Sequence, residues 1–134
     1  MKLGITDGSL VFAAGTIERT THRESFLASA IGRDAKMELV NEGWRQANIR
    51  PEPGIAATLV FKGDRLHQVW VLMEIPSDET GEWTMEIERK RKALHDKWLH
   101  AEIGEPPYEY AWGRINSEFD AKGCVSEIII TYAD

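Results

Sequence analysis

Two adjacent residues, His95 and Asp96, are the most suggestive polar pair in this 134-residue chain. An adjacent His and Asp can bind a metal ion together when further ligands stand at a suitable spacing. The other histidines are His22, His67 and His100, and none has that spacing. The structural alternative is that Asp96 pairs with a neighbouring Lys or Arg, while His95 is a partly exposed helical residue. We therefore predict no metal ion and no cofactor.

Two further groups could carry chemistry but lack partners. Glu118 and Asp120 could form a carboxylate pair for acid–base catalysis, yet Asp120 also begins an Asp-Ala-Lys-Gly turn. Cys124 follows this turn without the His partner that a nucleophilic thiol requires. We predict no catalytic residues, and the sequence leans away from an enzyme.

An aromatic group offers a binding surface instead. Tyr108, Tyr110 and Trp112 alternate along one expected strand beside Arg114, and Tyr, Trp and Arg are enriched in protein interfaces. The same side chains could equally fill a core beneath a helix, so both interpretations stay open. The candidate binding residues are His95, Asp96, Tyr110, Trp112, Arg114 and Asp120.

The element that must position these groups is a long helix over residues 83–104. Acidic residues crowd its first turns and basic residues its second half, as the helix dipole favours, and Gly104 followed by Pro106 ends it. Apolar residues at three-, four- and seven-residue intervals predict the buried stripe: Trp83, Ile87, Leu94, Trp98 and Ala101.

The rest of the chain alternates in the manner of β-hairpins. The predicted fold is α+β, a single domain over residues 1–134, with a short helix within residues 21–32 and the long helix packed on one face of an antiparallel, hairpin-rich sheet. About eight strands are expected, at residues 3–6, 9–14, 35–40, 44–49, 55–61, 66–75, 108–119 and 124–132. Residues 69–73 and 128–130 are apolar on both parities, which predicts cover on both faces of the sheet.

Composition excludes several classes of function. A net charge of -6 argues against a nucleic-acid-binding surface, because such surfaces cluster Lys and Arg. No apolar run approaches the roughly 18 residues of a membrane span, and we expect no signal peptide, because Lys2 is followed only by a short apolar run. The lone Cys124 fits a reducing compartment, so we expect a cytoplasmic protein. An acidic surface could attract a basic protein partner.

The C-terminal half also carries a recognisable pattern. Its residues are Trp83, Glu88, Arg89, His95-Asp96, Trp98-Leu99 and Gly104, then Tyr110, Trp112-Gly113, Ile115, Ser117, Phe119-Asp120, Lys122 and the strand 126–132. This pattern resembles small bacterial proteins, mostly uncharacterised, some of which sit beside secreted polymorphic toxins and are thought to act as immunity proteins.

The resemblance implies a cytoplasmic, non-enzymatic binding protein that occupies the active site of a toxin domain or a neighbouring surface. It brings no catalytic residues with it. The alternative function is a small enzyme or ligand-binding domain with a pocket between the long helix and the sheet, where His95, Asp96 and Tyr110 would converge.

Overall fold

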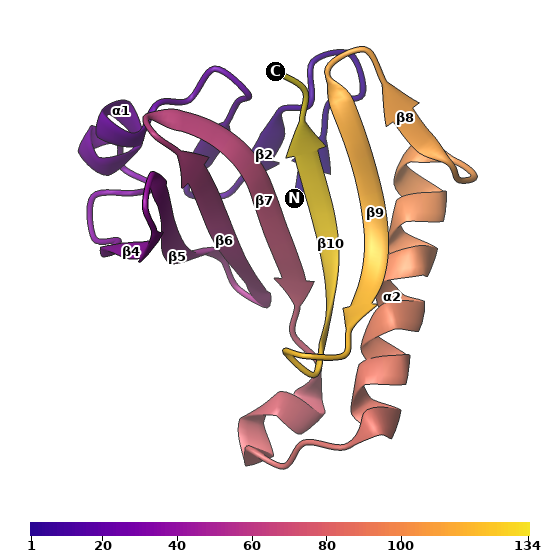
Figure 1. Ribbon diagram of the computed structural model, residues 1–134. Helices are drawn as coiled ribbons and strands as arrows, with labels where there is room; N and C mark the ends of the chain where they lie inside the picture. Colours follow the sequence, from indigo (N-terminus) through magenta and orange to yellow (C-terminus); the bar gives the residue numbers. More distant parts are fainter.

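The computed structural model describes residues 1–134, except for the side chains of Ser77 and Thr80. It confirms the α+β class, with one large and one small antiparallel sheet (Figure 1). The large sheet has seven strands in the order β4 (Met37–Asn41), β5 (Trp44–Glu52), β6 (Ile55–Lys62), β7 (Arg65–Met73), β10 (Val125–Tyr132), β9 (Gly113–Asp120) and β8 (Tyr108–Tyr110). The small sheet joins β1 (Lys2–Leu3), β2 (Leu10–Phe12) and β3 (Gly15–Ile17). The helices are α1 (Arg23–Ala28), the 3-10 turn η1 (Pro76–Thr80) and α2 (Met85–Ile103).

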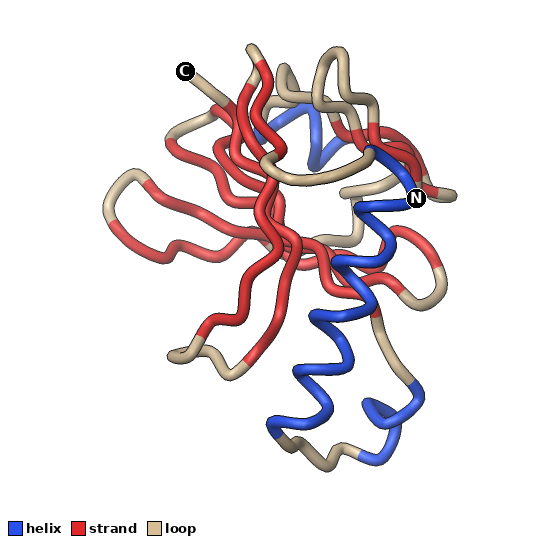
Figure 2. The backbone as a smooth tube through the Cα atoms, turned by 90° about the vertical axis from the view of Figure 1, so that its right-hand side faces the viewer, coloured by secondary structure: helices blue, strands red, loops and turns tan.

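One face of the large sheet carries all of the packed layers. Phe26 of α1 lies against Phe61, with ring centroids 5.8 Å apart, and Leu99 of α2 joins the same buried core. The small sheet covers this face too, because the Tyr132 hydroxyl donates to the Gly8 carbonyl at 2.8 Å. Figure 2 shows α2 running along one side of the strands. No described helix spans enough apolar length to cross a membrane.

The opposite face of the sheet, which we call the open face, is formed by the alternate side chains of β5, β6, β7, β10 and β9. Trp70 and Leu72 of β7 and Ile129 of β10 point to it and are only half-buried, whereas Val69, Val71 and Ile128 are fully buried on the packed face. The prediction that these apolar runs are covered on both faces is therefore wrong. Strand twist shelters the open face partly, but no described helix packs on it.

The caps of α2 agree with the predicted helix, but the buried stripe does not. The Thr84 hydroxyl accepts from the Ile87 amide at 3.2 Å, and Gly104 ends the helix with a φ of 88°. Trp83 is 47% exposed and Leu94 is 38% exposed, so the predicted apolar stripe lies largely outside the core. The buried side chains of α2 are instead Glu88, Arg91, His95 and Leu99. Of the predicted stripe, Trp98 is partly buried against the core.

The expected single strand over residues 108–119 is a tight hairpin. β8 and β9 are separated by Ala111 and Trp112, and Gly113 has a φ of 151°. A Cβ atom on Gly113 would lie 1.9 Å from the Thr131 carbonyl oxygen, so only glycine fits this close approach. Trp112 therefore lies in the turn between β8 and β9, and not in one strand with Tyr110 and Arg114.

The orientation of α2 can be tested with two leucines of the same helix. Leu99→Ala should lower the free energy of unfolding by about 2–5 kcal/mol, because Leu99 is 1% exposed. Leu94→Ala should lower it by about 1 kcal/mol or less, since much of that side chain already contacts solvent. Urea melts read at constant m-value measure both losses. A larger loss for Leu94→Ala would mean that the predicted stripe, not the observed one, faces the core.

Candidate functional site

The start of α2 contains a buried arginine whose hydrogen-bonding capacity is fully used. Arg91 Nε and Nη2 donate to Glu88 at 3.0 and 3.2 Å. Nη1 and Nη2 donate to the two carboxylate oxygens of Asp78 at 2.8 and 2.5 Å, and Nη1 also donates to the Met73 carbonyl at 2.8 Å. A guanidinium has five N–H donors, and all five have an acceptor here. We call Asp78, Glu88 and Arg91 the Arg91 clamp.

Glu88 is saturated in the same way. Besides its two bonds from Arg91, it accepts from the Ser126 amide at 2.8 Å and from the Trp83 indole at 3.2 Å. Burial acts to raise the pKa of Glu88, but the hydrogen bonds from Arg91 and Ser126 prevail and the pKa lies below its ordinary value. The hydrogen bond from Arg91 likewise lowers the pKa of Asp78.

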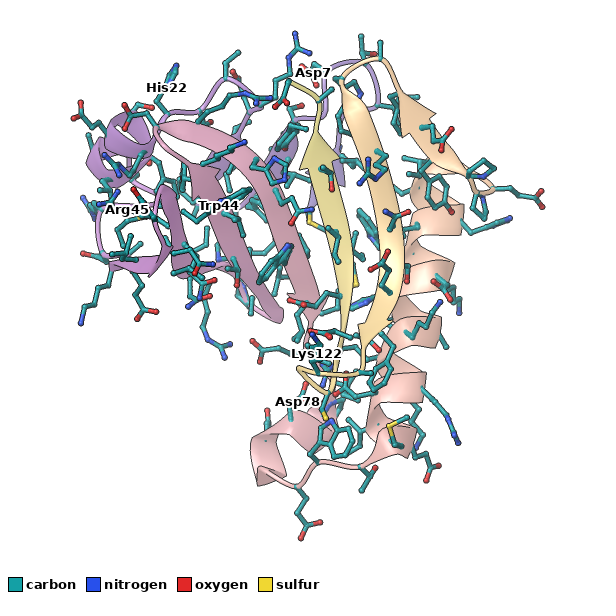
Figure 3. All side chains as sticks on the ribbon, in the orientation of Figure 1. Asp7, His22, Trp44, Arg45, Asp78 and Lys122 are labelled. Carbon is teal, nitrogen blue, oxygen red and sulfur yellow. The ribbon has the colours of Figure 1, made fainter. Side chains whose placement is uncertain are left out.

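The clamp therefore holds the fold, and its two buried members, Arg91 and Glu88, have no free donor or acceptor for a substrate. It ties η1, the end of β7 and the start of β10 to α2. Figure 3 shows Asp78 at the end of the molecule that also holds the β9–β10 turn with Lys122.

His95 and Asp96 lie on different sides of α2. His95 is completely buried, and its Nε2 accepts from the Met73 amide at 3.0 Å. Burial, and next the positive charge of Arg91, lowers the pKa of His95 to about 4, so the imidazole is neutral at pH 7. Asp96 is exposed and pairs with Lys92 at 2.9 Å. The predicted pairing of Asp96 is confirmed, and the predicted partial exposure of His95 is wrong.

A pocket between α2 and the sheet does exist, with a volume of about 510 Å³. Asp96 lines it together with Lys92, Ser117 and Tyr108, whereas His95 and Tyr110 do not. Burial acts to raise the pKa of Asp96, but the nearby Ser117 hydroxyl and Lys92 lower it overall. His95, Asp96 and Tyr110 thus do not converge, and the described residues contain no group of His, Cys, Asp and Glu side chains able to hold a metal ion.

Trp112 and Asp120 have structural roles. The Trp112 side chain is 3% exposed, its Nε1 donates to the Ile5 carbonyl at 2.7 Å, and its ring stacks on Tyr110 with centroids 5.1 Å apart. Trp112 therefore belongs to the core, which is the second of the two interpretations of this aromatic group. Asp120 accepts from the Lys122 amide at 3.0 Å, which confirms its predicted place in the turn.

Tyr110 and Arg114, two of the predicted residues, line the same groove. This groove of about 520 Å³ lies at the upper end of β7, β10 and β9 and is also lined by His67, Gln68 and Asp134. Arg114 is exposed and makes no ion pair with any residue that the structure describes. Burial lowers the pKa of His67, and its Nδ1 is buried without a hydrogen-bond partner. The groove offers polar contacts to a ligand but holds no activated nucleophile.

The open face below this groove is an ordered array of aromatic and amide side chains. Trp70 Nε1 donates to Gln68 Oε1 at 2.9 Å, and Gln68 Nε2 donates to Thr131 at 3.0 Å. The Trp44 ring of β5 and the His67 ring of β7 pack in a T-shaped arrangement with centroids 5.2 Å apart. Trp70 was missed because residues 69–73 were interpreted as covered on both faces. The available signal was the alternation along β7, which points Gln68 and Trp70 to one face of the sheet and Val69 and Val71 to the other.

The lower end of the open face is acidic. Glu118 and Glu127 lie directly opposite each other on β9 and β10. Burial, and then the charges of Asp120 and Glu88, raises the pKa of Glu127 to about 7. None of the causes of this shift is a cation, and Glu118 and Glu127 are therefore two carboxyl groups placed opposite each other without a basic side chain that lowers the pKa of Glu127.

Comparison with protein-family models, curated proteins and solved structures finds no match to this chain. The resemblance to immunity proteins therefore stays a prediction, and the site must be interpreted from its own geometry.

The clamp can be tested with two arginines of α2. Arg91→Met should lower the free energy of unfolding by about 3–5 kcal/mol, because it leaves two carboxylates without their cation. Arg89→Met removes an exposed guanidinium two residues away and should change it by about 0.5 kcal/mol or less. Guanidinium melts compare the two. Equal, small losses would show that the clamp contributes nothing to stability.

The raised pKa of Glu127 predicts a pH dependence with a definite sign. Between its ordinary value near 4.5 and the folded value of about 7, the folded chain keeps a proton that the unfolded chain has lost. The contribution of Glu127 to stability therefore falls as the pH rises through this window. Glu127→Gln should match the parent at pH 4 and exceed its free energy of unfolding by roughly 1–3 kcal/mol at pH 8. Melts at both pH values measure the difference, and a difference independent of pH would refute the assignment.

Proposed function

We propose that this chain is a non-enzymatic binding protein that presents its open face to a basic surface of a protein partner. The observation that carries the proposal is the pair Glu118 and Glu127, held opposite each other beside a half-buried aromatic surface. A Lys or Arg of a partner would place a positive charge beside this pair of carboxyl groups.

The composition of the open face supports the same proposal. Trp70 and Trp44 are large, half-buried and fixed by the contacts described above, which limits the conformational entropy lost when a partner binds. Aromatic anchors with a charged margin are typical of protein interfaces. The groove with Tyr110 and Arg114 continues this surface at its upper end.

The partner to test first follows from the resemblance of the C-terminal half to immunity proteins. On this proposal the partner is a toxin domain with a basic surface, bound in the cytoplasm, and the net charge of -6 favours rapid encounter with it. On this proposal, the protein neutralises the toxin domain by covering the basic surface of that domain.

A charge reversal with a matched control tests the proposal. The ligand is the purified product of the gene adjacent to the one that encodes this chain, and binding is measured by calorimetry at two salt concentrations. Glu118→Lys, on the open face, should weaken binding about tenfold or more, because it replaces an attraction by a repulsion. Glu86→Lys makes the same change at an exposed glutamate of α2 and should leave binding unchanged.

Two outcomes would contradict the proposal. One is that none of the adjacent gene products binds. The other is that Glu86→Lys weakens binding as much as Glu118→Lys, which would assign the interaction to α2 or to net charge alone.

A further inference from the structure

The groove at the upper end of the open face contains two basic side chains from different strands, Arg114 of β9 and His67 of β7. It lies where β7 and β9 begin and where β10 ends, near the top of the sheet in Figure 1. Neither basic side chain has a hydrogen-bond or ion-pair partner among the residues that the structure describes. The fold therefore gives no reason of its own for their meeting in one groove.

A β-bulge turns His67 toward this groove. The partner strand β6 pairs with Leu66 and next with Gln68, so His67 is the extra residue of β7 and has no partner on β6. Leu66 and Val69 are fully buried, and the two residues between them both line the groove. A regular strand would point these two residues to opposite faces. Bulges commonly redirect a side chain in this way beside a functional site.

The imidazole of His67 is neutral and offers one N–H donor. Burial is the main cause that lowers its pKa. The charge of Asp134 acts to raise the pKa, whereas those of Arg65, Lys62 and Arg114 lower it further. Nδ1 is buried without a partner, and an N–H group buried without an acceptor is unfavourable. The proton of the neutral ring therefore lies on Nε2, which is the donor available to a ligand.

Arg114 supplies the free positive charge of the groove. It is exposed, and Glu109, directly opposite it on β8, forms no ion pair with it. The neighbouring Arg65 is already occupied, because it donates to the carboxylate of Asp134 and to the Ala133 carbonyl. The planar guanidinium of Arg114 can thus bind the two oxygens of a carboxylate side by side.

The charges around the groove favour a ligand with a single negative charge. One free guanidinium and one neutral N–H group compensate a carboxylate. Glu109 and Asp134 line the same groove and would repel the second charge of a phosphate dianion.

The groove also has room for the body of an organic acid. Its volume of about 520 Å³ lies within the usual range of small-molecule sites. Tyr110 lines it, and the ring of Tyr110 is fixed by stacking on Trp112 with an angle of 9° between the two planes. A fixed aromatic ring is a suitable wall for the apolar part of a ligand.

We propose that this groove binds a small organic carboxylate, which accepts hydrogen bonds from the Arg114 guanidinium and from His67 Nε2 while its body packs along Tyr110. The proposal does not depend on the proposed function, because Glu118 and Glu127 lie nearer the other end of β9 and β10. The two are also tested separately, since a small carboxylate is titrated into the purified chain alone.

A benzoate titration of the full-length chain, followed by NMR, tests the site. Benzoate should bind with a Kd of about 1 mM and shift the signals of the Arg114 Nε–H group and the His67 ring. The pKa of His67 should rise when benzoate is bound, because a neighbouring carboxylate favours the charged imidazole. Benzamide has the same shape without the charge and should bind about tenfold more weakly or less. Phenyl phosphate at pH 8, where it is a dianion, should also bind more weakly than benzoate.

Two arginine variants give a matched comparison. Arg114→Met should weaken benzoate binding about tenfold or more, because it removes the guanidinium. Arg89→Met makes the same change at an exposed arginine of α2 and should leave binding unchanged. His67→Phe keeps an aromatic ring but removes the donor, and it should weaken binding about threefold. Arg114 is exposed, so the melting curve of Arg114→Met should match that of the parent.

Four results would overturn the proposal. The first is the lack of a saturable shift at about 20 mM benzoate, well above the expected Kd. The second is equal binding of benzamide, which would show that the negative charge plays no part. The third is tighter binding of phenyl phosphate, which would contradict the preference for a single charge. The fourth is an equal loss for Arg89→Met and Arg114→Met, which would place the binding outside the groove.

Discussion

The interaction on which the rest of the structure depends is the fork of Arg91. A buried guanidinium is tolerated only when its donors are satisfied, and here the acceptors come from the end of β7, from η1 and from α2 itself. Glu88 then links α2 to β10, because it accepts a hydrogen bond from the Ser126 amide. The rotation of α2 about its axis is fixed by this set of bonds, because any other rotation would leave a charge buried without a partner. Trp83 and Leu94 remain exposed as a result.

The carboxyl groups of the Arg91 clamp and of the open face have pKa values that are shifted in opposite directions. In the clamp, both carboxylates bind the one guanidinium of Arg91, and both have pKa values below their ordinary range. On the open face, Glu127 lies opposite Glu118, and burial, followed by the charges of Asp120 and Glu88, raises its pKa to about 7. The raised pKa is the more informative of the two, since two carboxyl groups opposite each other do not stabilise the free protein. This contrast directs the search for a partner to the open face rather than to the buried cluster.

The sequence predicted the positions of the helices and strands better than it predicted which of their faces are buried. Turn residues and alternation located the hairpins β4–β5, β6–β7 and β9–β10 but not β2–β3 or β8–β9, and Gly104 located the end of α2. The apolar periodicity predicted the wrong buried side of α2. It treats Leu94 as buried, and it treats Glu88 and Arg91 as exposed although the two side chains form an ion pair that allows their burial. The signal was present, since Glu88, Arg91, His95 and Leu99 recur at helical spacing.

The candidate site was predicted less well, for a related reason. Trp112 was assigned to a strand face because Gly113 looked like an ordinary strand residue, whereas its close approach to Thr131 makes the turn. The open face was not predicted, because an apolar run in the sequence does not show whether one face or both faces of its strand are covered. Tyr110 and Arg114 were placed correctly near each other, since both flank the same tight turn.

The bonds between the two ends of the chain have a consequence for folding during synthesis. Tyr132 and Gly8 are separated by 124 residues, and Trp112 and Ile5 by 107. The turn between β1 and β2 therefore finds its partners only when almost the whole chain has left the ribosome. We expect the first residues to remain unstructured until then and the molecule to close late, at the slow rate that contacts of such sequence separation impose. A nascent chain that stops before β10 would lack the surface on which its own beginning folds.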